Sequence, residues 1–254
     1  MTGRLIFTVD VDRDVNFEIE GKSAAGSLDR GQGTEPRFES TEKGLEIILD
    51  VLNSFNMKGT FFLEGRTAST IDCSMLKDHC VGFHGMDHED LTKLSSEELK
   101  DVMDNGYESV KKMVKTPTCF RAPYMKTSDD VLENLRRLGI KHDSSMYADP
   151  GTAPYDIGGV TEHPVFKGKD ARGKTIAAFL WPMHEGARTP SDYLSLARTS
   201  GDADLIICTH SWHMVESRER GIMTWAEMEH NRKSLGQLIK LLVDEGYEPA
   251  TLTE

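Results

Sequence analysis

The chain has 254 residues, 38% of them hydrophobic and 28% charged, a composition typical of an ordinary globular protein. Its formal net charge of −12 argues against a non-specific nucleic-acid binder and against docking on anionic lipid, because both normally need a basic surface. The longest unbroken apolar run, residues 176–183, is too short to cross a bilayer. We therefore expect one domain over residues 1–254, with no nucleic-acid or membrane partner.

The first residues lead directly into the apolar segment Leu5–Val9, without the pattern of a secretory signal peptide. The cysteines form neither a C-x-x-C pair nor a dense disulfide framework, so we expect reduced thiols. Both features predict a cytoplasmic protein. The cysteines are Cys73, Cys80, Cys119 and Cys208.

Short apolar runs alternate with segments of helical period, which is typical of a parallel sheet with crossover helices. The number of units favours an α/β fold, a distorted barrel of seven or eight β/α units, over an open sheet. The expected strands are Arg4–Asp10, Gly59–Glu64, Val81–His84, Thr118–Arg121, Ile140–Asp143, Thr175–Trp181, Asp204–His210 and Pro249–Leu252. The expected helices begin at Thr41, Ser95, Thr127 and Thr224.

Two connections are unusually long, Arg13–Ser40 and Ser211–Met223. Long loops in compact domains are commonly functional covers, and both leave the ends of strands where barrel enzymes carry their sites. We expect both connections to contact substrate.

Carboxylates, imidazoles and a guanidinium lie where the expected strands end. Buried polar groups cost desolvation energy unless they are paired or bound to a metal, so their concentration on one rim predicts a catalytic centre. Each also has a structural reading: Arg121 as an ion pair, His210 as a core histidine, Asp143 as a helix cap or turn former. The residues are Asp10, Asp12, Asp14, His84, His88, Arg121, Asp143 and His210.

The spacing of these residues suits a metal. Asp10 and Asp12 point to the same side of an extended strand, so one can bind a metal while the other receives a proton. His84 and His88 share a face if the chain turns into a helix after the third strand. Two imidazoles and one carboxylate suit Zn²⁺, with iron, cobalt or manganese also compatible.

The sequence resembles the polysaccharide deacetylase family, the NodB-homology fold of carbohydrate esterase family four. The resemblance runs from Leu5 to about Trp212 and is carried by the segments Phe83–Thr92, Phe120–Tyr124 and Thr60–Gly65. The resemblance implies a hydrolase that uses Zn²⁺, or another divalent transition metal, to remove the acetyl group from an N-acetylated sugar. The implied metal ligands are Asp12, His84 and His88. The implied catalytic residues are Asp10 as base, Arg121 as its orienting partner, His210 as acid and Asp143 as the carboxylate that tunes His210. Tyr124 and Trp212 would contact the substrate.

The first motif departs from the family's commonest pattern, because Val11 separates Asp10 from Asp12. This leaves the division of roles between them open, with Asp14 as a spare ligand. A separated pair is also similar to a cytoplasmic-type branch that includes hydrolases of cyclic amides, so a cyclic ureide or imide is an alternative substrate. A barrel that binds sugar without catalysis is the second alternative. A soluble or lipid-linked acetamido sugar is the expected substrate, and the oligomeric state cannot be read from the sequence.

Overall fold

A computed structural model describes residues 3–14, 37–170 and 172–254. Its main sheet has the strand order β11-β1-β2-β3-β4-β5-β8-β7, and β14 pairs with the start of β1. Every neighbouring pair is parallel except β7 with β8. The strands are β1 (Arg4–Val11), β2 (Thr60–Leu63), β3 (Cys80–Phe83), β4 (Cys119–Phe120), β5 (His142–Asp143), β7 (Tyr155–Ile157), β8 (Val160–Glu162), β11 (Leu205–His210) and β14 (Glu248–Ala250).

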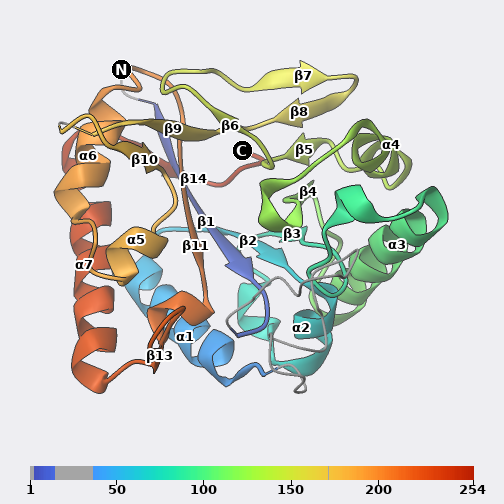
Figure 1. Cartoon of the computed structure of the whole chain (residues 1–254), viewed down its shortest axis with the longest axis horizontal. Helices are drawn as coiled ribbons and strands as arrows, with labels where there is room; N and C mark the ends of the chain where they lie inside the picture. The colour runs from blue at the N-terminus through green and yellow to red at the C-terminus, as the bar shows by residue number, and fades with distance from the viewer. Residues whose placement is uncertain (1–2, 15–36, 171) are drawn as a thin grey trace.

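A small second sheet, β10-β9-β6, lies beyond β11 (Figure 1). It is formed by β6 (Tyr147–Ala148), β9 (Val165–Lys169) and β10 (Thr175–Ala177). The expected strand Thr175–Trp181 is therefore wrong in its second half. After β10 the chain runs beside β11, where Phe179 bridges Cys208, and it enters helix α5 (Trp181–His184) at Trp181. Proline at 182 suits the first turn of a helix, which explains why the strand stops.

Helices cover the sheet on both sides, with α6 and α7 at one end of the view and α3 and α4 at the other (Figure 1). Capping boxes are present at Ser95 and Thr224, where two of the expected helices begin. The short helices α2, α5 and α6 were not predicted, because they carry too few turns to give a clear period. The remaining bounds are α1 (Glu39–Ser54), α2 (Gly65–Thr70), α3 (Ser96–Met113), α4 (Asp129–Arg137), α6 (Pro190–Arg198) and α7 (Trp225–Asp244).

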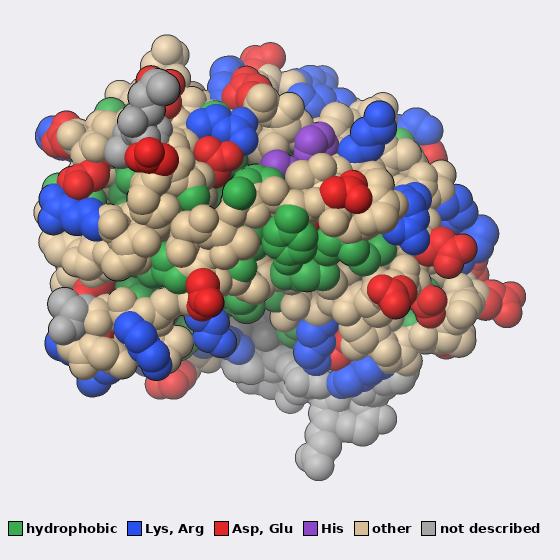
Figure 2. Space-filling view, turned by 90° about the horizontal axis from the view of Figure 1, so that it is seen from above, with side chains coloured by type: hydrophobic (Ala, Val, Ile, Leu, Met, Phe, Trp, Pro, Cys, Tyr) green, Lys and Arg blue, Asp and Glu red, His purple; other side chains and the backbone are tan. Residues whose placement is uncertain are grey.

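Strand β1 lies at the centre of the core, with β11 on one side and β2 and β14 on the other. Its apolar side chains are buried on both faces, as expected of a parallel strand between layers of helices. The face of the molecule in Figure 2 carries hydrophobic side chains at its centre and charged side chains around them. No helix of the described residues is both long and apolar enough to span a membrane.

Helix α1 approaches the end of β11 at Gly44. A Cβ atom built on Gly44 would lie 1.8 Å from the carbonyl oxygen of Ser211, so only glycine fits there. Beside it, the Thr41 hydroxyl donates to the carbonyl of Asp12 and lies 2.6 Å from the Ser211 hydroxyl. These contacts join the ends of β1 and β11, from which Asp10, Asp12 and His210 emerge.

Candidate active site

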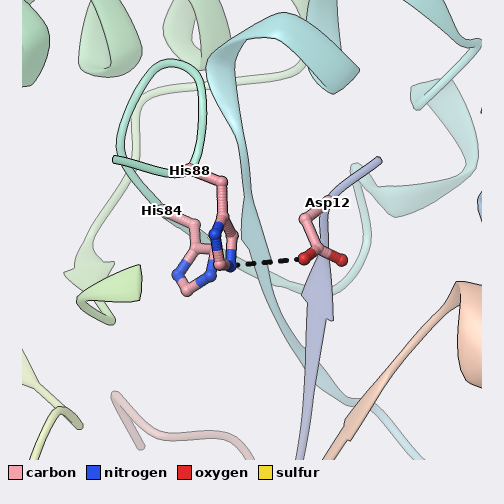
Figure 3. A group of neighbouring side chains, drawn as sticks. All are labelled: Asp12, His84 and His88. Carbon is pink, nitrogen blue, oxygen red and sulfur yellow. Dashed lines mark ion pairs between the residues drawn. The ribbon is translucent and has the colours of Figure 1, made fainter. Parts of the chain in front are cut away.

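Asp12, His84 and His88 come together at the carboxyl ends of β1 and β3 (Figure 3). Each offers one ligand atom, these atoms lie within 4.8 Å of one another, and all three residues are buried. Nε2 of His88 is 3.4 Å from Oδ2 of Asp12. Two imidazoles and one carboxylate are a donor set that suits a divalent transition metal and leaves positions open for substrate and water.

The orientation of His84 supports a metal site. Its Nδ1 lies 2.7 Å from the carbonyl oxygen of Arg121, so it donates to that oxygen and leaves Nε2 with a free lone pair. Nε2 is buried and has no hydrogen-bond partner in the described part of the chain. A buried nitrogen without a partner is unfavourable, and a bound cation would satisfy it. The residues present therefore fit a metal.

His84 and His88 do not share a helix face. Residues 84–90 form a loop, in which Gly85 has φ 72° and His88 has φ 58°. The carboxylate of Glu89 holds this loop by accepting from the backbone N–H groups of Met86 and Asp87. The expected helix is wrong, but the turned backbone brings both imidazoles to the same place.

Asp10 and Arg121 form a buried ion pair beside the three ligands. Nη1 of Arg121 donates to Oδ1 of Asp10 over 2.9 Å, and both side chains are buried. Nε and Nη2 of Arg121 donate to the carbonyl and hydroxyl of Ser144. Burial alone would raise the pKa of Asp10, but the charge of Arg121 offsets the cost of burial and the pKa is lowered.

His210 lies across from the three ligands, with Nε2 4.0 Å from Oδ2 of Asp10. Its ring contacts Phe179 at 5.1 Å and Trp212 at 5.2 Å between centroids. Burial lowers the pKa of His210 to about 3, with His213 and His84 adding to the effect, although Asp10 opposes it. His210 is therefore neutral near neutral pH.

One cavity of about 210 Å³ connects these groups. Tyr124 and Trp212, both expected near substrate, line it. Tyr124 and its neighbour Met125 have φ 60° and 56°, a left-handed conformation that is unusual for residues of this size and often marks a functional site. The cavity walls are formed by Asp10, Asp12, His84, His88, Ala122, Tyr124, Met125, Tyr147, Phe179, Trp181, His210, Trp212, His213 and Arg218.

Asp143 does not reach His210, so its expected tuning role is corrected. Nδ1 of His210 has no hydrogen-bond partner among the described residues, and Oδ1 of Asp143 accepts from the Ser145 hydroxyl. Ser145 in turn accepts from the N–H of Ala122, next to Arg121. Strand β5 is separated from β11 by four strands of the sheet, so Asp143 supports the Arg121 side of the site.

Asp143 also lies opposite Glu162 in the register of β5 and β8. Burial is the main cause that raises the pKa of both carboxyls. The charge of Asp143 raises the pKa of Glu162 further, to about 9, whereas the hydrogen bond with Glu162 lowers the pKa of Asp143. A buried carboxyl pair of this kind holds a proton at neutral pH.

Asp14, considered above as a further metal ligand, is not in the ligand group and instead contacts the start of α1. Its two oxygens accept from the N–H groups of Ser40 and Thr41 at the start of α1, over 3.1 and 2.8 Å. It therefore caps α1. The neighbouring Arg13 is fully buried and pairs with Glu64 and Asp87, an ion network that the sequence did not predict. Most of the long connection Arg13–Ser40, residues 15–36, lies outside the described residues.

The second long connection, Ser211–Met223, forms one wall of the cavity. It contains a 3-10 turn at Trp212–Met214 and the short strands β12 (Glu216–Ser217) and β13 (Gly221–Ile222). Glu185, at the end of α5, holds this wall: it accepts from Nε2 of His213 over 2.9 Å, from the Ser217 hydroxyl and from the N–H of Arg218. Glu185 could not be predicted from the sequence, because nothing in the spacing links α5 to the residues after β11.

Comparison with known families gives one family model, described as Polysaccharide deacetylase, that matches residues 21–142. The matched segment contains His84, His88 and Arg121, whereas Asp10, Asp12 and His210 lie outside it. A peptidoglycan deacetylase of Helicobacter pylori is 29% identical over 156 residues, 59% of this chain and 51% of the relative. A peptidoglycan-N-acetylglucosamine deacetylase of Bacillus cereus is 27% identical over 188 residues, 70% of this chain and 80% of the relative. The alignment thus spans about half of the H. pylori protein.

Solved structures share the fold along nearly the whole chain. A pseudoenzyme of carbohydrate esterase family 4 from Bacillus anthracis has a TM-score of 0.57 at 15% identity, covering 99% of this chain and 64% of that one. A family 4 carbohydrate esterase from Streptomyces lividans, in complex with acetate, has a TM-score of 0.55 at 13% identity, covering 98% and 92%. These likenesses confirm the expected α/β fold, a curled sheet of the NodB type.

Proposed function

We propose that this chain, which is similar to polysaccharide deacetylases over residues 21–142, is a metal-dependent hydrolase that removes the acetyl group from an N-acetylated sugar. The observation that carries the proposal is the convergence of Asp12, His84 and His88 within 4.8 Å in a cavity that also holds Asp10 and His210. Deacetylation releases a free amine and acetate, and it needs an activated water and a proton for the departing nitrogen.

Asp12, His84 and His88 would hold the cation. A bound divalent metal would polarise the acetyl carbonyl and make water a better nucleophile near neutral pH. The lone pair of Nε2 on His84 is directed for this purpose, because Nδ1 is held by the carbonyl of Arg121. The sugar would enter the cavity, where the aromatic side chains of Tyr124 and Trp212 would pack against it.

Asp10 is the base in this proposal. Its ion pair with Arg121 keeps the carboxylate ionised despite burial, so that it accepts the proton of the attacking water. That proton passes to Nε2 of His210, 4.0 Å from Asp10 at rest, and from there to the nitrogen as the C–N bond breaks. The neutral resting state of His210 suits a group that must first receive the proton it delivers.

The intact pairing of Asp10 with Arg121 also argues for catalysis over simple binding, since a barrel that only binds sugar has no need of a fixed, ionised base. The separated Asp10–Val11–Asp12 pattern keeps ring opening of a cyclic amide as the second candidate reaction.

One assay distinguishes these functions. The protein is stripped with a chelator, reloaded with Zn²⁺, Co²⁺ or Mn²⁺, and offered N-acetylglucosamine oligomers, N-acetylglucosamine and a cyclic ureide. We expect acetate release from the sugars that disappears in the chelated protein and returns with metal. Ring opening without acetate release would replace the proposal with the second reaction. Sugar binding with no product in the metal-loaded protein would indicate a binding barrel.

A further inference from the structure

Arg218 stands out in the wall of the cavity because, among the described residues, no carboxylate forms an ion pair with its guanidinium. In the described part of the chain, only Arg136 and Arg218 among the arginines form no ion pair with a carboxylate. Arg136 lies on α4 and donates to the carbonyl of Gly158, whereas Arg218 is exposed and lines the cavity. The protein carries a net charge of −12, so acidic residues are more numerous than basic ones. An arginine in the cavity wall that pairs with none of the described carboxylates is therefore unusual.

The main chain of Arg218 is fixed by the rest of the site. Its N–H donates to Oε1 of Glu185 over 2.9 Å, and the same oxygen accepts from Nε2 of His213, which is fully buried. The neighbouring Ser217 hydroxyl donates to the other Glu185 oxygen over 2.7 Å. These hydrogen bonds fix the main chain at Arg218, so its side chain extends from a defined position at the edge of the cavity.

The same wall leaves buried nitrogens without partners. Nε1 of Trp212 and Nδ1 of His213 are inaccessible and have no hydrogen-bond partner in the described residues, although both side chains belong to the cavity wall. The charge of Arg218 also reaches this region: burial is the main cause that lowers the pKa of His210 and of His213, and Arg218 adds to both. Because those nitrogens are buried and Arg218 is exposed, the guanidinium is the group of this wall that a ligand in the cavity can reach.

We propose that Arg218 binds a carboxylate or phosphate group of the substrate, so that the preferred substrate is an acetamido sugar that also carries an anionic group. A guanidinium forms paired, planar hydrogen bonds with both kinds of anion, which gives it selectivity for charged over neutral sugars. This inference rests on the proposed function for its choice of sugar, but it concerns a subsite separate from the metal, the base and the acid.

The test compares N-acetylglucosamine with N-acetylglucosamine 6-phosphate and N-acetylmuramic acid, which carry a phosphate and a carboxylate. For the metal-loaded wild type we expect kcat/KM for one of the anionic sugars to exceed that for the neutral sugar by about tenfold. Which of the two it is identifies the anion. In Arg218→Gln the ratio should fall close to one, and in the matched control Arg136→Gln it should remain at the wild-type value. Raising the salt concentration should also reduce the wild-type ratio.

Binding of the same three sugars, measured by calorimetry, gives a readout that does not need turnover. If no sugar releases acetate but the anionic sugars bind through Arg218, the proposed function fails and the subsite stands. If acetate is released with a ratio near one in the wild type, or with the same ratio in wild type and Arg218→Gln, the subsite is refuted and the proposed function stands.

Discussion

Nη1 of Arg121 donates to Oδ1 of Asp10 over 2.9 Å, and the carbonyl oxygen of the same arginine lies 2.7 Å from Nδ1 of His84. One residue on the loop after β4 therefore orients the candidate base with its side chain and a candidate metal ligand with its main chain. The other guanidinium nitrogens donate to Ser144, so the arginine itself has little freedom to move.

Replacement of Arg121 by Gln should raise the pKa of Asp10, because burial would no longer be offset by the nearest cation. The acid limb of the pH profile of kcat/KM should move to higher pH, and the rate at neutral pH should fall by about 10²-fold or more. The folded protein should also lose stability: an Asp with a lowered pKa stabilises above its unfolded pKa and loses that contribution as pH falls. An acid limb identical to that of wild type and of Arg136→Gln would contradict this.

Replacement of His84 by Gln should abolish metal binding while the fold remains. The expected result is a bound-metal content near zero by elemental analysis, with an unchanged circular dichroism spectrum, because two protein ligands hold a transition metal poorly. His230→Gln, a histidine outside this cavity, is the control and should keep its metal. Full metal content in His84→Gln would remove that residue from the ligand set.

Replacement of His210 by Gln should separate chemistry from metal binding. The variant should retain the cation, since His210 is outside the ligand group, and lose about 10²–10⁴ in kcat with a smaller change in KM. Steady-state kinetics together with metal analysis measure both quantities. A kcat close to that of wild type would show that a residue other than His210 protonates the departing nitrogen.

Replacement of Glu162 by Gln should flatten the dependence of stability on pH. Burial, together with Asp143, raises the pKa of Glu162 to about 9, so its contribution to stability is complete below its unfolded pKa and is lost as pH rises toward 9. Between pH 5 and pH 9, the free energy of unfolding of wild type should fall more steeply than that of the variant, by up to about 1.4 kcal/mol per pH unit. Urea denaturation across this range measures it, and parallel curves would show that Glu162 does not titrate as expected.

Replacement of Gly44 by Ala should destabilise the protein by several kcal/mol, on the order of other severe overpacking changes, because the new Cβ would collide with the carbonyl of Ser211. Gly236→Ala is the matched control: it is also in a helix, its Cβ would meet Phe55 only at 3.9 Å, and it should be neutral or stabilising by about 1 kcal/mol. Thermal unfolding compares the two. Equal melting temperatures would mean that α1 can move away from β11 at little cost.

Much of the fold followed from local signals in the sequence. The parallel strands are continuous apolar runs, and the helices after Ser95 and Thr224 begin with capping boxes that need only residues three apart. The small sheet was missed because β6 has only two residues and its pairing with β9 depends on contacts across the fold. The bend at Trp181 depends on tertiary packing in the same way.

The candidate site was predictable where the residues lie at the end of a strand or directly after it, as Asp10, Asp12, His84 and His210 do. Residues whose partners come from distant loops were not. Asp143 was misassigned because order along the chain says nothing about which strand ends face each other, and the clamp between Glu185 and His213 joins segments that no spacing rule connects.

The hydrogen bond from His84 to the main chain at position 121 has an evolutionary consequence. A backbone carbonyl is present whatever amino acid stands at position 121. A substitution there therefore removes the side chain that keeps Asp10 ionised but leaves the hydrogen bond that orients His84. A single substitution at this position would thus abolish catalysis while metal binding is kept. An enzyme with this site can evolve in one step into a protein that binds the metal without turnover.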